Sequence, residues 1–102
     1  MAVVYITEYA RQGRDASGFM MVVADEPPVA NQTVAITAGS VQSSALNAGT
    51  KFIRVHTDAI CSIEIGTNPT ASATTRRLAA NSTEYFSVPL NQSYKVAVIT
   101  NV

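Results

Sequence analysis

The stretch from Lys51 to Gly66 constrains the fold of this chain more than any other. Its sequence, KFIRVHTDAICSIEIG, alternates apolar with more polar residues on both sides of a short centre. A period of two is typical of β-strands that bury one sheet face. We therefore predict two strands joined by a tight turn at Thr57 and Asp58. The residues expected to face the core are Ile53, Val55, Cys61, Ile63 and Ile65.

The rest of the chain predicts strands as well. No segment places apolar residues at helical spacing behind an N-terminal cap, and β-branched residues occur throughout. Turn formers recur roughly every eight to twelve residues, as in sandwiches and barrels. We predict an all-β fold, a single β-sandwich or jelly roll of about seven or eight short antiparallel strands. A chain of 102 residues is long enough for one such core.

The first thirty residues differ from the remainder. After an apolar, extended segment from Ala2 to Tyr9, residues 10–18 lose all apolar periodicity and contain two glycines, which indicates a loop or arm. FMMVVA at residues 19–24 is apolar, and the paired prolines of residues 25–31 favour an extended connection. We predict an N-terminal arm over residues 1–30 with one or two strands, followed by a sandwich domain over residues 31–102. Such an arm is suited to adding a strand to a neighbouring chain or wrapping around it.

Composition argues against several classes of function. Seven basic residues balance seven acidic ones and only 14% of residues are charged, so the clustered basic surface of a nucleic-acid-binding protein is not expected. No apolar run approaches the roughly 20 residues that cross a bilayer. The N-terminus lacks the basic region and cleavage site of a secretory signal, which predicts a chain that folds in a cytoplasm.

The sequence offers no convincing catalytic, metal or cofactor site. His56 and Cys61 fall on opposite strand faces, whereas a nucleophile and its base must converge on one cleft. One histidine and one cysteine are too few for a zinc site, and the glycines between strands stand singly instead of forming a phosphate loop. We expect Cys61 to be a small buried hydrophobe and the protein not to be an enzyme.

The body of the chain resembles a known group of proteins. The segments NAGTKFIRVHTDAICSIEIGTNPTA and LAANSTEYFSVPLNQSYKVAVI, within residues 30–102, resemble small virion proteins encoded beside head genes in tailed bacteriophages and prophages. The resemblance implies a short β-sandwich with a variable N-terminal extension and no catalytic motif. It further implies a decoration or cement protein that binds the major capsid protein on the outside of the head, often as a homotrimer. The location so implied is the virion surface, after synthesis in the bacterial cytoplasm.

Candidate contact residues follow from the arm and from the polar face of the Lys51–Gly66 stretch. They are Tyr5, Tyr9, Arg11, Arg14, Phe19, Arg54 and His56. Two other roles stay open. One is a neck, tail or fibre component. The other is a receptor- or glycan-binding module of the virion, for which an aromatic platform could be drawn from Tyr5, Tyr9, Phe19, Tyr85 and Tyr94.

Overall fold

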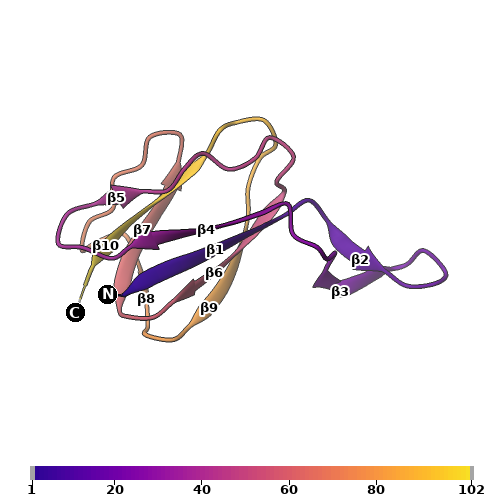
Figure 1. Ribbon diagram of the computed structural model, residues 1–102, viewed down its shortest axis with the longest axis horizontal. Coiled ribbons are helices and arrows are strands. Elements are labelled where there is room, and N and C mark those ends of the chain that lie inside the picture. The colour runs from indigo at the N-terminus through magenta and orange to yellow at the C-terminus, as the bar shows by residue number, and fades with distance from the viewer. Residues whose placement is uncertain (1, 102) are drawn as a thin grey trace.

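The computed structural model describes residues 2–101, and Met1 and Val102 lie outside this range. The described chain contains no helix and ten strands, all of whose pairings are antiparallel (Figure 1). The strands are Val3–Tyr9 (β1), Gln12–Arg14 (β2), Met20–Ala24 (β3), Ala30–Ala35 (β4), Val41–Gln42 (β5), Phe52–Thr57 (β6), Cys61–Gly66 (β7), Arg76–Leu78 (β8), Thr83–Ser87 (β9) and Lys95–Thr100 (β10). The predicted all-β class is confirmed, but the predicted seven or eight strands were too few.

Eight of the strands form two four-stranded sheets that contribute to one hydrophobic core. The strand orders are β4-β1-β6-β9 and β5-β10-β7-β8. The core consists of side chains that are at most 6% exposed; they come from both sheets and, for Leu46 and Val88, from connecting segments. These core residues are Val4, Ile6, Val34, Leu46, Ile53, Val55, Cys61, Ile63, Leu78, Val88, Val96 and Val98. The inward face predicted for the Lys51–Gly66 stretch is confirmed, because four of its five residues are among them and Ile65 packs against them.

The pairing predicted within that stretch was wrong. β6 pairs with β1 and β9, whereas β7 pairs with β10 and β8, so the two strands belong to different sheets. The turn between them carries the chain from one sheet to the other. Alternation shows which face of each strand is buried, but two strands that face each other across a core show the same alternation as two paired strands.

The first strand also differs from the prediction. β1 was assigned to an N-terminal arm over residues 1–30, but it lies between β4 and β6 in the centre of its sheet. Val4 and Ile6 are at most 1% exposed. The predicted boundary at residue 30 therefore does not separate arm from body, because β1 and β4 on either side of the projecting segment are neighbours in one sheet.

Only the segment between β1 and β4 projects from the body (Figure 1). We call residues 11–25 the arm; within it β2 and β3 pair as an antiparallel ribbon with an irregularity between Gln12 and Arg14. The backbone N–H of Asp25 donates to the carbonyl oxygen of Arg11 at 3.0 Å, so the two ends of the arm lie side by side. A cis peptide bond joins Glu26 to Pro27, directly after the arm in the sequence.

The arm gives the molecule an elongated shape, 48 × 27 × 21 Å. β1 begins and β10 ends at the end of the body opposite to the arm (Figure 1). No helix of the described residues could span a membrane.

Candidate interaction surface

The outward faces of the two sheets are covered differently. On the β5-β10-β7-β8 sheet, the loop of residues 67–75 lies over β7: Asn101 bridges Ser62 and Ala73 through its Nδ2 atom, at 2.6 Å from Ser62 Oγ and 3.2 Å from the Ala73 carbonyl oxygen. Ser62 is fully buried as a result, although it faces away from the core. The outward face of the β4-β1-β6-β9 sheet instead carries both hollows of the surface described below.

Strand register places four of the predicted contact residues on this open face. Tyr5 lies opposite His56, and Tyr9 lies opposite Phe52. Arg54 is paired with Tyr85 of β9. Because side chains alternate across a sheet, these residues share the face opposite to Ile53 and Val55. The predicted residues Tyr5, Tyr9, Arg54 and His56 therefore come together, while Arg11, Arg14 and Phe19 lie on the arm.

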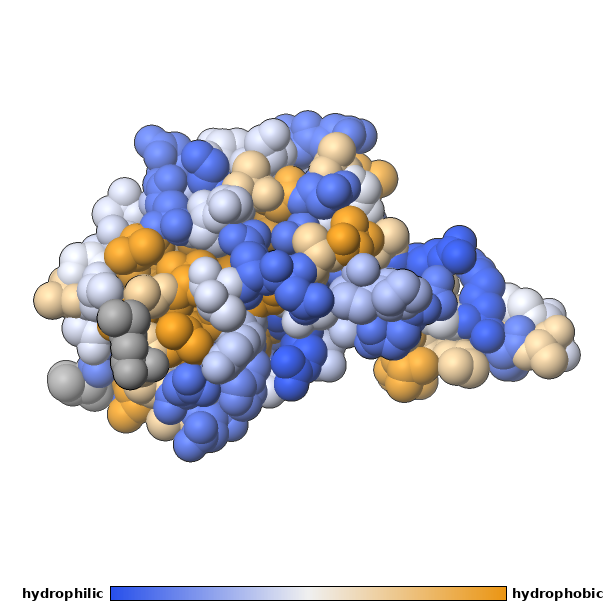
Figure 2. All heavy atoms as spheres, in the orientation of Figure 1, coloured by the Kyte–Doolittle hydropathy of each residue, from blue (hydrophilic) through white to orange (hydrophobic). Residues whose placement is uncertain are grey.

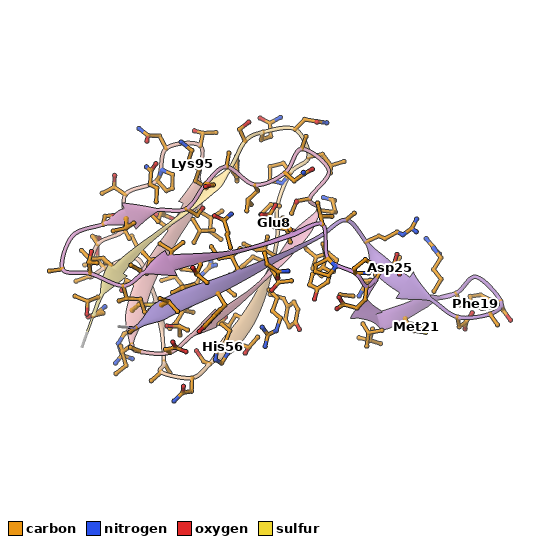
Figure 3. The ribbon with its side chains drawn as sticks, in the orientation of Figure 1. Glu8, Phe19, Met21, Asp25, His56 and Lys95 are labelled. Carbon is orange, nitrogen blue, oxygen red and sulfur yellow. The ribbon has the colours of Figure 1, made fainter. Side chains whose placement is uncertain are left out.

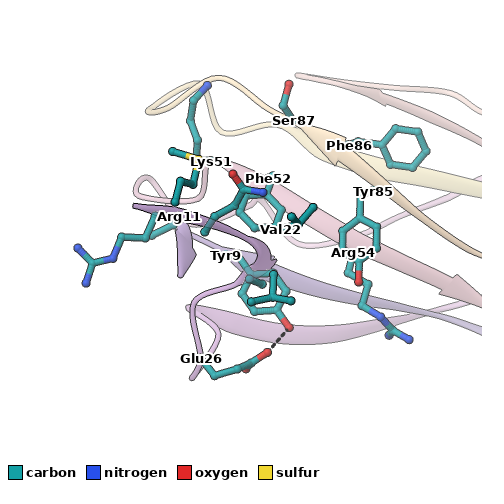
Figure 4. A pocket seen from close by; sticks show the side chains of 15 residues that line it. Tyr9, Arg11, Val22, Glu26, Lys51, Phe52, Arg54, Tyr85, Phe86 and Ser87 are labelled. Carbon is teal, nitrogen blue, oxygen red and sulfur yellow. Dashed lines mark hydrogen bonds between the residues drawn. The ribbon is translucent and has the colours of Figure 1, made fainter. Parts of the chain in front are cut away.

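A groove of about 970 Å³ separates the arm from this face, and we call it the arm groove (Figure 4). The body side is formed chiefly by aromatic and basic residues, and the arm side by β3. The residues that line it are Tyr9, Ala10, Arg11, Gln12, Met20, Val22, Val23, Ala24, Glu26, Lys51, Phe52, Arg54, Tyr85, Phe86 and Ser87. Its volume is at the upper end of the roughly 300–1,000 Å³ found for recognition cavities.

The floor of the arm groove is fixed by Tyr9. Its ring stacks on that of Phe52 with 5.3 Å between centroids, and its hydroxyl donates to Glu26 Oε2 at 2.8 Å (Figure 4). Tyr9 is only 6% exposed. Burial, together with the hydrogen bond to the Glu26 carboxylate, raises the pKa of the Tyr9 phenol above its usual value of 10.0. This hydrogen bond links Glu26, which follows the arm in the sequence, to β1 of the body.

A second, smaller hollow of about 430 Å³ lies further along the same face. Tyr5 and His56 border it with ring centroids 6.3 Å apart, and Arg54 borders both this hollow and the arm groove. His56 Nδ1 lies 2.8 Å from the Thr83 hydroxyl. The outward face of the sheet therefore offers one continuous surface from Tyr5 to the arm.

The turn at the tip of the arm is well ordered by hydrogen bonds. Asp15 Oδ1 accepts from the backbone N–H groups of Ser17 and Phe19 at 2.9 and 3.0 Å, and Arg14 Nη1 donates to the Gly18 carbonyl oxygen at 2.9 Å. Gly18 has a φ of 86°, which favours glycine. At the other end of the arm, Arg11 Nε lies 2.8 Å from Asp25 Oδ2. Residues 10–18, for which a loop or arm was predicted, include β2 and the turn of this folded ribbon.

The arm carries five of the nine large hydrophobic side chains that are exposed among the described residues. Phe19, at the tip, is 72% exposed and Val22 is 96% exposed. Met20, Met21 and Val23 are 61%, 39% and 55% exposed. Figures 2 and 3 show the arm with its apolar side chains projecting beyond the body. Because soluble proteins seldom expose an apolar patch of this kind, the arm is a candidate contact surface.

The described residues include neither a cluster of metal ligands nor an accessible cysteine thiol. Among residues 2–101, no group of three or more His, Cys, Asp and Glu side chains could hold a metal ion. Cys61 is fully buried, its Sγ lies 3.5 Å from Thr57 Oγ1, and burial raises the pKa of its thiol. The arrangement is suited to binding an apolar or aromatic surface.

Sequence reasoning missed part of this surface. Val22 was seen only as one residue of an apolar run. The signal for the arm was present in FMMVVA, because six consecutive apolar residues exceed what one buried strand face requires. Nothing in the local sequence placed β9, with Tyr85, beside β6.

Comparison of the chain with protein-family models, with curated proteins and with solved structures found no match. The surface must therefore be interpreted from its own geometry.

Proposed function

We propose that this protein is a structural component of a bacteriophage virion without enzymatic activity. In this proposal it binds the major capsid protein on the outside of the head and stabilises contacts between neighbouring capsid subunits. The resemblance of residues 30–102 to small virion proteins supports the phage assignment. We interpret the two sheets that share a core as the β-sandwich that this resemblance implies.

The exposed, preformed arm is the observation that carries the proposal. A ribbon whose turn is fixed by Asp15 and whose ends are joined by the Arg11–Asp25 ion pair loses little conformational entropy on binding. Its apolar side chains supply contact area. The low density of charge leaves few ion-pairing side chains to desolvate in a contact. These are properties of an assembly protein.

A cryo-EM map of the purified particle tests this proposal. A decoration protein is expected in hundreds of copies on the head. A handful of copies at the neck or tail would instead support the alternative role as a neck, tail or fibre component. Purified heads lacking the protein should also bind it when it is added back, and heads that fail to do so would contradict the capsid role.

A receptor- or glycan-binding module is the second candidate. Phe52, which stacks on Tyr9, and the 60% exposed Tyr85 give the arm groove an aromatic wall. Such walls stack on sugar rings or other flat apolar groups. Binding on a glycan array that is lost in Tyr85→Ala but kept in Leu90→Ala would favour this role, since Leu90 is exposed elsewhere on the body.

A further inference from the structure

Strand β3 is apolar on both of its faces. Met20, Val22 and Val23 line the arm groove. A Cβ atom built on Gly13 would lie 3.6 Å from Met21 Cε and 3.9 Å from Val23 Cγ2, so Met21 and Val23 lie over the Gly13 side of the ribbon. A strand that buries one face needs apolar residues only at alternate positions, and runs without alternation are typical of strands covered on both faces. The arm is therefore built to be enclosed between two surfaces.

The arm groove offers one such surface and the arm itself offers the other. Phe52 and Tyr85 form an aromatic wall on the body side, and Val22 stands on the opposite side. A ribbon entering this groove would contact the wall with one face and the resident arm with the other. Both contacts would be apolar.

We propose that the arm of each molecule seats in the arm groove of a second copy of this chain. The contact is reciprocal about a two-fold axis, the commonest symmetry of soluble oligomers. The faces bearing Met20 and Val22 meet across the axis, and the opposite faces, with Met21, pack on the partner's aromatic wall. This arrangement covers both faces of β3 at once.

The size of the exposed surface agrees with a stable dimer. Residues Phe19–Val23 expose between 39% and 96% of their individual surfaces, which leaves on the order of 500 Å² of apolar surface on each arm. Two arms and the surfaces that face them would bury on the order of 1,500–2,000 Å², within the range of stable interfaces.

Charge favours a second copy over a strongly charged partner. The charged side chains of the arm have partners within it: Arg11 with Asp25, Arg14 with a carbonyl oxygen, and Asp15 with two backbone N–H groups. Lys51, Arg54 and Glu26 border the groove with both signs of charge. Two identical copies of a chain with no net charge do not repel each other. The inference rests on the proposed assembly role and names the partner of the arm.

Sedimentation equilibrium of the full chain tests the proposal. The wild-type chain is expected to have twice its 10.8 kDa mass. Val22→Asp should weaken the dimer by at least about a hundredfold, because a charge is placed twice at the buried centre of the contact. Val22 is 96% exposed within one chain, so the variant should fold normally. The matched control is Leu90→Asp, since Leu90 is 46% exposed and lies outside the groove, and it should remain a dimer.

Two further variants identify the surfaces in contact. Tyr85→Ala should weaken the dimer by about tenfold or more, because the wall that receives the partner's arm is truncated. In a Cys61→Ala background, Val22→Cys should form a disulfide between copies under mild oxidation, whereas Leu90→Cys should not. A Val22→Cys crosslink combined with an unchanged dimer in Tyr85→Ala would show that the arms pair edge to edge, and would overturn seating in the groove.

A monomeric wild-type chain would overturn the inference, and so would a mass of three copies, the number implied by the resemblance to virion proteins. Failure here is distinguishable from failure of the proposed function. A monomer that still binds heads contradicts only the dimer, and a dimer that binds no heads contradicts only the capsid role.

Discussion

Glu8 is the residue whose replacement tests the structure most directly. It is 2% exposed at the end of β1, where the sheet meets the arm, and points into the body (Figure 3). Its Oε1 atom accepts from the backbone N–H of Asn47 at 2.7 Å and from the Thr50 hydroxyl at 2.8 Å. Its Oε2 atom accepts from Gln32 Nε2 at 3.3 Å. The carboxylate thereby joins β1 and β4 to the turn that leads into β6.

Glu8→Ala should lower the free energy of unfolding by about 3–5 kcal/mol. The change leaves the buried hydroxyl of Thr50 and the partly buried backbone N–H of Asn47 without this acceptor, and hydrogen bonds to charged groups each contribute about 1.5–3 kcal/mol. In urea, with a slope of roughly 1–1.5 kcal/mol per molar, the midpoint should fall by about 2–5 M. Circular dichroism or intrinsic tyrosine fluorescence would follow the transition.

Glu8→Gln is the matched control because it preserves size. Its amide oxygen can still accept from Asn47 and Thr50, but its NH₂ group faces the NH₂ group of Gln32. Gln32 is not free to turn, since its Oε1 accepts from the backbone N–H of Ser44 at 2.9 Å. We expect a smaller loss of about 1–2 kcal/mol. A loss below about 1 kcal/mol in Glu8→Ala would refute the structural role of this network.

Three other predictions concern the arm, the first strand and pH. Replacing residues 12–24 by two glycines should leave a folded body with a melting temperature within a few degrees of wild type, because the ends of the arm already lie side by side; an unfolded product would contradict the division into arm and body. Deleting residues 2–29 should instead abolish folding by circular dichroism, because β1 leaves the centre of a sheet; a cooperative thermal transition would contradict the topology. The pKa values of Cys61 and Tyr9 are raised in the folded protein. Because the unfolded chain loses these protons first, their contribution to stability should be constant below about pH 8. It should fall as pH rises past the unfolded values of 9.0 and 10.0. Urea midpoints from pH 7 to 11 would measure this, and a Cys61→Ala, Tyr9→Phe double variant should show a smaller fall.

The sequence could predict strands and their buried faces but not which strands pair. Alternation in β6 and β7 correctly identified Ile53 and Ile63 as core residues, because burial of a strand face is recorded in its own residues. Pairing depends on residues far along the chain, and β6 has its partners in β1 and β9. A turn does separate β6 from β7, as predicted. It connects two sheets, however, and not two paired strands.

The candidate surface was predicted in part for the same reason. Tyr5, Tyr9, Arg54 and His56 could be assigned to outward strand faces by alternation, and register then placed them together. The arm was recognised from its loss of apolar period, but its extent was overestimated. The apolar residues Val4 and Ile6 are compatible with an arm that packs on a neighbouring chain and equally with a central strand of a sheet. The local sequence does not distinguish these two environments.

The position of the chain ends has a practical consequence. Ala2 and Asn101 are held at the end of the body remote from the arm, where their backbone groups bond to Ile36 and Ile60. A fluorescent protein, epitope or enzyme genetically fused to either terminus would therefore extend away from the arm groove. The scaffold can present cargo from both of its termini while its contact surface stays accessible.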